Sequence, residues 1–396
     1  MRNLNYRFEV ERIRTCIDRE WISNTAQELV NIPSVTMDEN AVCSCFKDKL
    51  RELGLGVDVR EITSGRYNLY AKLPGKGDGA SLILNGHLDT IPIGDHALPH
   101  IDGDRLYGRG ATDMKGGMAS MLGAAKALIE SNVELNGDLW LTAVVGHEEV
   151  EAEKDGPKAF IKDLNSGRVK GDRILIVEGR DALWVMSMGS LVFTINLRSL
   201  KGGMHTQYVP FEENPINFVG KIISRIRELQ KDLDLHRIHP LAGAERIDIG
   251  LIQAGDYFNR TPVDCSLIGT RRWIAGQSAH DILKEITVLV QDICDSEDME
   301  IDVKMDHERE PFETPIDDVA VKAVANAHKI VTKEEAEYVG MRIVGDANLY
   351  VHGSGLPTFY YGPSNETAHS DVEWVSLDRL NSAASVYALA ALQYCK

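Results

Sequence analysis

The sequence predicts a two-domain α/β protein: a mixed, mostly parallel sheet flanked by helices, interrupted by an inserted ferredoxin-like α+β domain. Three observations lead to this prediction. The chain has 396 residues, more than a single hydrophobic core usually serves. Short β-type runs alternate with helical stretches between residues 55 and 141, a pattern typical of α/β folds. The middle of the chain then changes to the order strand, helix, strand, strand, helix, strand.

The first domain is expected to begin with several short strands and one long helix. A glycine-rich turn at 74–79 separates two of these strands, and the helix is rich in Ala, Leu and Met. One of the runs is continuously apolar, as strands buried inside parallel sheets are. The predicted strands are 57–62, 68–73, 81–85, 138–145 and 173–177, and the predicted helix is 114–131.

The insert and the segment after it complete the predicted architecture. The insert's strands are expected at 191–197, 246–253, 263–273 and 300–305, with helices at 216–233 and 278–296. After it, a helix at 317–331, a strand at 357–361 and a helix at 377–394 return to the first domain. The predicted bounds are therefore 1–189 and 307–396 for the first domain and 190–306 for the insert.

Composition excludes several functional classes. The net charge of -17 repels nucleic acid and anionic membranes, so neither is an expected partner. No apolar run approaches the roughly 20 residues that span a bilayer. The six scattered cysteines form no CxxC pair, and Cys43 and Cys45 are expected to be helix residues. The N-terminal residues show no secretory signal, so the chain is expected to be cytoplasmic.

Histidine and carboxylate residues follow the predicted apolar strands. The carboxyl ends of parallel strands meet at one edge of a sheet, and these residue types bind divalent cations. Taken alone, each is ordinarily structural: a histidine in a hydrogen bond, a surface pair of glutamates or an aspartate that caps a helix. Their common placement favours a metal site. The residues are His87, Asp89, Glu148, Glu149, Glu178 and His369, together with Asp113 where a loop meets a helix.

Six short motifs in fixed order strengthen this interpretation. They are GHLDT at 86–90, GRGATDMKGG at 108–117, EE at 148–149, VEG at 177–179, GGMHT at 202–206 and GPSNETAHSDVEW at 362–374. With these motifs the chain resembles, over nearly its whole length, the zinc aminoacylase and carboxypeptidase family. That family includes acetylornithine deacetylase, succinyl-diaminopimelate desuccinylase and glutamate carboxypeptidases. The resemblance implies a zinc-peptidase-like catalytic domain, with the insert as a lid and dimerisation domain of a homodimer.

The resemblance also implies a role for each metal-site residue. Asp113 would bridge two ions, with His87 and Glu178 completing one site and Glu149 and His369 the other. Glu148 would be the general base that takes a proton from the attacking water. Asp89 would accept a hydrogen bond from the His87 imidazole and fix its tautomer. Zinc is the expected metal, with cobalt or manganese as alternatives.

Three residues of the insert receive roles in substrate binding by the same resemblance. His205 would donate to the oxyanion of the reacting amide, reaching from the partner subunit. Asn259, in NRTP, and Arg272 stand where related enzymes hold the substrate's α-carboxylate, which an arginine binds bidentately. Arg271 is an alternative residue for binding this carboxylate, because the sequence does not distinguish its role from that of Arg272.

Several positions depart from the family's pattern. His147 stands where relatives commonly have an aspartate before the glutamate pair, and Thr270 where they often have an aspartate before the arginine. The segment 94–108 lacks a Trp and a Pro-Phe pair that relatives frequently carry, and its His96 and His100 are expected to be loop residues.

The expected function is hydrolysis of the amide of an N-acyl amino acid. The small-molecule substrate would be cleaved by water activated between two divalent ions. A dipeptidase or carboxypeptidase with the same metal centre is the alternative, because no residue decides what flanks the amide. A relative that binds metal without catalysis is the third possibility, although the retained Glu148 argues against it.

Overall fold

The computed structural model describes residues 2–94, 98–294 and 298–396, and the chain divides into two compact units. Unit 1 comprises residues 1–185, 314–339 and 349–396, and unit 2 comprises residues 186–313 and 340–348. Among the described helices, none combines the length and apolar character needed to cross a membrane.

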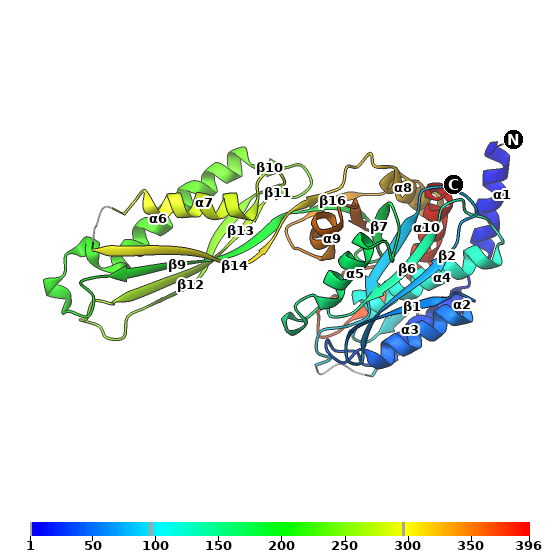
Figure 1. Cartoon of the computed structure of the whole chain (residues 1–396), viewed down its shortest axis with the longest axis horizontal. Coiled ribbons are helices and arrows are strands. Elements are labelled where there is room, and N and C mark those ends of the chain that lie inside the picture. The colour runs from blue at the N-terminus through cyan, green and yellow to red at the C-terminus, as the bar shows by residue number, and fades with distance from the viewer. Residues whose placement is uncertain (1, 95–97, 295–297) are drawn as a thin grey trace. The chain divides into compact units, whose positions relative to one another are not determined.

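A mixed sheet flanked by helices forms the centre of unit 1 (Figure 1). Four neighbouring strands, in the order β6-β3-β7-β17, are parallel, and the strands on either side pair antiparallel. The predicted fold class is thus confirmed, with parallel pairing confined to these four strands. The strands of this sheet are β1 (Val57–Thr63), β2 (Arg66–Leu73), β3 (Leu82–His87), β6 (Leu139–Val144), β7 (Arg173–Ile176), β8 (Leu183–Ser187), β15 (Phe312–Glu313), β16 (Tyr338–Met341) and β17 (Thr358–Tyr360).

The burial of the central strands explains their sequences. All six residues of β3 are buried, as are the three of β17, which explains why both strands are largely apolar. A second sheet is made of β4 (His100–Asp102), β5 (Arg105–Tyr107) and β18 (Trp374–Ser376), and it joins the segment after β3 to the segment before the last helix.

Helix α4 (Gly116–Glu130) has twelve buried residues out of fifteen, which explains its Ala, Gly and Met content. It packs against α2 and α10. A Cβ on Gly117 would lie 1.9 Å from the Val177 carbonyl oxygen, so only glycine lets the start of α4 approach the end of β7. The other helices of unit 1 are α1 (Arg2–Thr15), α2 (Arg19–Asn31), α3 (Asn40–Glu52), α5 (Asp155–Asn165), α8 (Val319–Thr332) and α10 (Leu377–Tyr394). Helix α9 (Asp346–Ser354) has its first three residues in unit 2 and the rest in unit 1.

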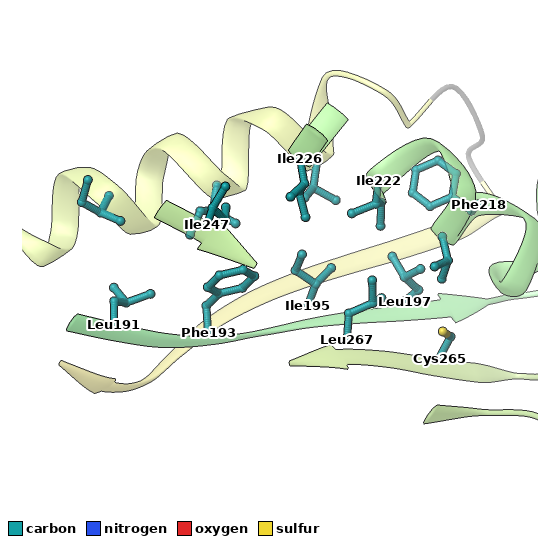
Figure 2. Packing of buried hydrophobic residues seen from close by; sticks show 14 of the residues in the cluster. Leu191, Phe193, Ile195, Leu197, Phe218, Ile222, Ile226, Ile247, Cys265 and Leu267 are labelled. Carbon is teal, nitrogen blue, oxygen red and sulfur yellow. The ribbon is translucent and has the colours of Figure 1, made fainter. Parts of the chain in front are cut away.

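Unit 2 has the predicted strand, helix, strand, strand, helix, strand order. Its four strands are all antiparallel in the order β12-β13-β9-β14. Residues of β9 alternate in burial, so Leu191, Phe193, Ile195 and Leu197 share the face that packs on α6, as Figure 2 shows. The elements are β9 (Gly189–Ser199), α6 (Pro215–His236), β12 (Arg246–Ala254), β13 (Asp264–Trp273), α7 (Ala279–Gln291) and β14 (Met299–Arg309), with β10 (Ile238–His239) and β11 (Gly243–Ala244) as a small pair.

Two predicted elements differ from the structure by four or more residues at one end. The helix expected at 278–296 ends at Gln291, and part of its predicted span, 295–297, lies outside the described residues. The strand expected at 300–305 continues to Arg309. Cys43 and Cys45 lie in α3, as expected.

Candidate metal centre

The four parallel strands place the candidate ligands at one edge of the sheet. β3 ends at His87, β6 leads to Glu148 and Glu149, β7 leads to Glu178, and β17 leads to the loop that carries His369. Because these strands are parallel neighbours, their carboxyl ends lie side by side. Asp113 lies in the short helical turn Ala111–Lys115 before α4, and its peptide bond to Met114 is cis.

Asp113 lies between the two histidines. Its Oδ1 is 3.2 Å from His87 Nε2, and its Oδ2 is 3.2 Å from His369 Nε2. Glu148 Oε2 lies 3.3 Å from the same nitrogen of His369. Ligand atoms of His87, Asp113 and Glu148 all lie within 4.8 Å of one another, a spacing that could hold a metal ion. One carboxylate with a histidine at each oxygen is the arrangement that a ligand bridging two ions requires.

The donor atoms fit a divalent cation. His87 Nε2 and Asp113 Oδ1 are buried and have no hydrogen-bond partner among the described residues, although they lie 3.2 Å apart. Two ligands bound tetrahedrally to zinc at about 2.0–2.1 Å are separated by about 3.3 Å. Buried polar atoms without partners are rare in proteins, and a shared cation would satisfy both.

The tautomer of His87 is set by the main chain. His87 Nδ1 lies 2.9 Å from the carbonyl oxygen of Asp89, which can only accept, so Nδ1 carries the hydrogen. In the neutral ring the lone pair is then on Nε2, which faces Asp113. Burial lowers the pKa of His87, but Asp113, Glu148 and Asp89 outweigh burial and hold this pKa well above its ordinary value. The site therefore favours a positive charge at His87 Nε2.

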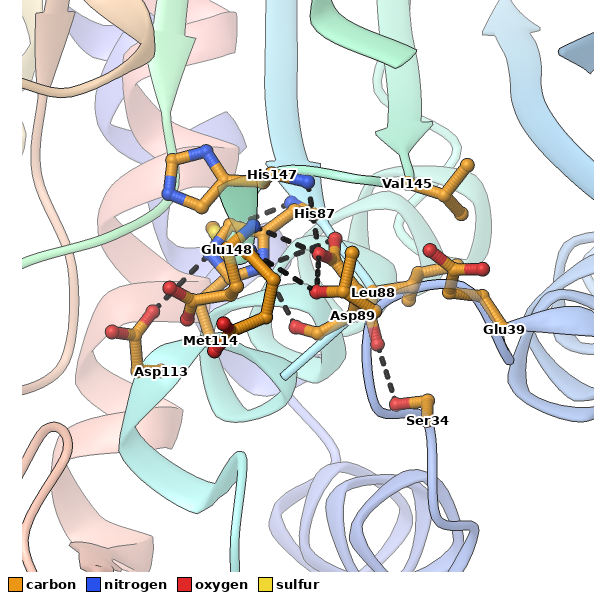
Figure 3. A network of polar contacts seen from close by, with 12 residues as sticks. Ser34, Glu39, His87, Leu88, Asp89, Asp113, Met114, Val145, His147 and Glu148 are labelled. Carbon is orange, nitrogen blue, oxygen red and sulfur yellow. Dashed lines mark hydrogen bonds and ion pairs between the residues drawn. The ribbon is translucent and has the colours of Figure 1, made fainter. Parts of the chain in front are cut away.

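Asp89 holds the loop of the glutamate pair. Its Oδ2 accepts hydrogen bonds from the backbone N–H groups of His147 (2.8 Å) and Glu148 (2.9 Å), which lie beside it in Figure 3. The same oxygen accepts a hydrogen bond from Thr36 Oγ1 (2.7 Å). The Asp89 carboxylate is 3.8 Å from His87 Nδ1. The predicted acceptor was this carboxylate; the structure instead gives the backbone oxygen of the same residue. The Asp89 carboxylate therefore positions the Glu148 backbone, because a single oxygen of Asp89 accepts hydrogen bonds from all three donors.

The groups that surround Glu178 and Glu149 differ. Burial, followed by the negative charge of Asp113, raises the pKa of Glu178 to about 7, and a cation beside it would favour its ionised form. Glu149 is half-buried, and its backbone N–H donates to Thr36 Oγ1 at 3.3 Å. The structure thus groups Glu148, rather than Glu149, with His87 and Asp113.

His147 stacks on His87. The two rings are nearly parallel, at 9°, with centroids 4.1 Å apart. Sequence reasoning noted His147 as a departure but gave it no contact, and it missed Thr36, which carries no motif. His96 and His100 were both expected to be loop residues. His100 instead begins strand β4 and stacks on Tyr107, and His96 lies outside the described residues.

The remaining candidate residues belong to unit 2. His205 is exposed, its Nδ1 accepts from the Gln207 N–H at 3.2 Å, and its Nε2 is 3.4 Å from Asn259 Nδ2. The structure therefore brings His205 and Asn259 together within this unit.

The neighbouring arginines Arg271 and Arg272 have different surroundings. Arg271 is fully buried and paired with Glu245 (2.5 Å) and Glu285 (3.2 Å). Arg272 Nη1 is buried without a hydrogen-bond partner among the described residues, and burial lowers the pKa of Arg272. Arg271 is therefore neutralised inside the unit, whereas Arg272 retains donor capacity for an anion.

Comparison with known proteins identifies relatives over most of the chain. The chain is 27% identical over 384 residues to N-formyl-4-amino-5-aminomethyl-2-methylpyrimidine deformylase of Bacillus subtilis (strain 168), covering 87% of each protein. It is 26% identical over 380 residues to succinyl-diaminopimelate desuccinylase of Hydrogenovibrio crunogenus, covering 91% of this chain and 96% of that protein.

The fold is also similar to that of solved structures. The crystal structure of aminopeptidase PepT from Bacillus cereus ATCC 10987 matches with a TM-score of 0.81 at 20% identity, covering 96% of this chain and 100% of that one. A family model described as peptidase family M20/M25/M40 matches residues 83–393, which is more than half of the chain. The chain therefore belongs to this family of metal-binding hydrolases that act on amide bonds.

Proposed function

We propose that this protein is a two-metal amidohydrolase that removes the acyl group of an N-acyl amino acid. The observation that carries the proposal is the Asp113 carboxylate, whose two oxygens each lie 3.2 Å from a different histidine. Five ligands are proposed: His87 and Glu178 for one ion, Glu149 and His369 for the other, and Asp113 for both. Zinc is the proposed metal, because histidine and carboxylate ligands suit it.

The proposed mechanism uses the chain's own groups around the amide. Bound divalent ions would polarise the amide carbonyl and lower the pKa of water at the site. Glu148 takes the proton of the attacking water and returns it to the leaving amine. His205 donates a hydrogen bond to the oxyanion, from the partner subunit of a proposed homodimer. His369 lies 3.3 Å from Glu148 Oε2, and Asp89 holds the Glu148 backbone, so the base has a fixed position.

An acyl substrate is favoured over a peptide by the relatives. The deformylase and the desuccinylase are named for removing a formyl and a succinyl group, and both cover most of this chain. Arg272 favours a substrate whose amine product carries a carboxylate. Its Nη1 is buried without a hydrogen-bond partner among the described residues, whereas the neighbouring Arg271 is paired with Glu245.

The test is release of free amine from a substrate panel. N-formyl, N-acetyl and N-succinyl amino acids, dipeptides and an N-formyl aminopyrimidine would be incubated with zinc, cobalt, manganese or a chelator. We expect turnover of an acyl amino acid that a chelator abolishes and added metal restores. Exclusive turnover of dipeptides would replace the proposal by a dipeptidase, and chelator-resistant turnover would exclude the metal mechanism.

The two neighbouring arginines give a matched pair of variants. Arg272→Ala should raise KM for a carboxylate-bearing substrate about 10- to 100-fold, because a charged hydrogen bond is lost, with little change in stability. Arg271→Ala should instead lower the free energy of unfolding by about 3 kcal/mol, the low end of the cost of breaking a buried ion pair, because Glu245 and Glu285 keep only Arg237, at 3.6 Å and 2.9 Å. Steady-state kinetics and urea unfolding of both variants check this. An unchanged KM for Arg272→Ala would remove it from substrate binding.

A further inference from the structure

Glu373 is a buried carboxylate four residues after His369, and the mechanism above does not use it. Its side chain is 0% exposed. Glu373 Oε1 accepts hydrogen bonds from the backbone N–H groups of Thr112 (2.8 Å) and Asp113 (3.0 Å). Its Oε2 accepts from Arg109 Nη1 at 2.8 Å. One carboxylate thus binds the main chain at the proposed bridging ligand.

Arg109 extends this contact to the other ligand segment. Its Nη2 donates to the carbonyl oxygen of Ser370 at 3.2 Å, directly after His369. Thr112 Oγ1 donates to the Trp374 carbonyl oxygen at 2.6 Å, and the Gly108 N–H donates to the Glu373 carbonyl oxygen at 3.0 Å. The loop before α4 and the segment after His369 are therefore bound along their length. Arg109, Thr112 and Glu373 provide these contacts.

The His369 backbone needs such support. His369 has φ +60°, a left-handed conformation that a residue with a side chain adopts at a cost of about 1–3 kcal/mol. In this conformation its Nε2 reaches Asp113 Oδ2 at 3.2 Å. A ligand group must be held to within about 0.5 Å to function, and side chains that lock its backbone provide that precision.

We infer that Glu373 is a positioning residue for both ions. It fixes the Asp113 backbone directly and, through Arg109, the backbone beside His369, so that the shared ligand and the second ion's histidine keep one spacing. The inference rests on the two-metal function proposed above and extends it to residues that are not ligands.

Glu373→Gln separates these two contacts. The glutamine oxygen can still accept from Thr112 and Asp113, but its NH₂ group would face Arg109, donor against donor. Arg109 then loses its charged partner and its hold on Ser370. The second ion, which needs His369, should be bound about 10- to 100-fold more weakly, as is typical when an outer partner of a ligand is lost. The first ion should be affected less.

Asp318 offers a matched control in the same unit. Its Oδ1 accepts from the backbone N–H groups of Ala320 and Val321, and its Oδ2 accepts from Arg173 Nε at 2.8 Å. This is the bonding pattern of Glu373, at the start of α8 instead of at the metal ligands. Asp318→Asn therefore measures the cost of losing such a charge when no ligand depends on it.

The experiment titrates cobalt(II) into the metal-free wild type, Glu373→Gln and Asp318→Asn, with absorption spectra, ion stoichiometry and urea unfolding of each. We expect similar unfolding midpoints for the two variants, with a weakened second ion and an altered cobalt spectrum only for Glu373→Gln. Equal binding of both ions by all three proteins would overturn the inference. If Glu373→Gln does not fold, Arg109→Lys tests the same contact, because lysine can pair with Glu373 but cannot also reach Ser370.

The proposed function fails by a different signature. A wild type that binds one ion or none would refute the two-metal centre itself. A wild type that binds two ions, together with a Glu373→Gln variant that also does so at equal affinity, refutes only the role of Glu373.

Discussion

Glu148→Gln should lower kcat about 10²- to 10⁴-fold while both ions remain bound, since a general base contributes rate enhancement of this size. Glutamine keeps the volume of the side chain, and the backbone N–H of residue 148 still donates to Asp89. What is lost is the ability to take a proton from water. Steady-state kinetics with acyl amino acids and metal analysis of the purified variant measure both quantities.

Glu149→Gln is the adjacent comparison. If Glu149 is a ligand and Glu148 the base, the Glu149 variant should lose affinity for one ion, and excess metal should restore part of its rate. The structure groups Glu148 with His87 and Asp113, which makes this comparison decisive. Loss of an ion from Glu148→Gln, with its rate recovered by excess metal, would exchange the two roles.

Asp113→Asn should reduce the bound ions from two to at most one and abolish turnover. An asparagine has a single acceptor oxygen, so it cannot face both His87 Nε2 and His369 Nε2 with a ligand atom. The loss in affinity should exceed the roughly 100-fold that removing an outer partner costs. Stoichiometry by equilibrium dialysis, with activity across a range of zinc concentrations, provides the measurement.

Asp318→Asn again serves as the comparison for Asp113→Asn, because it neutralises a buried aspartate far from any ligand in sequence. Two ions bound to Asp113→Asn with wild-type affinity would contradict the bridging role and, with it, the proposed two-metal centre.

The fold could be predicted because apolar runs and glycine-rich turns mark the strands of both units. The strands at 81–85 and 173–177 were placed within two residues of β3 and β7 for this reason. Before residue 55 only the helical environment of Cys43 and Cys45 was predicted; the bounds of α1, α2 and α3 were not, because these segments carry no motif. The short strands β4 and β18 also went unnoticed, since three residues show no periodicity.

The site was predictable only where a side chain belongs to a motif. His87, Asp113 and His369 follow strands or begin a helix, and their spacing in the structure could be anticipated from the parallel sheet. The contacts of Thr36 and Glu373 could not be, because each depends on a backbone N–H or hydroxyl group that a distant segment contributes. The acceptor for His87 was mistaken for a similar reason: a backbone carbonyl leaves no trace in a sequence.

The position of β17 has a consequence for synthesis of the protein. β17 pairs in parallel with β7, although unit 2 and α8 lie between them in the chain. While the ribosome is still making residues 186–357, the apolar edge of β7 has no partner on that side, and an open strand edge is a template for aggregation. We expect nascent chains that stop before β17 to need chaperone protection, and full metal binding to follow the synthesis of β17, because His369 comes after this strand in the chain.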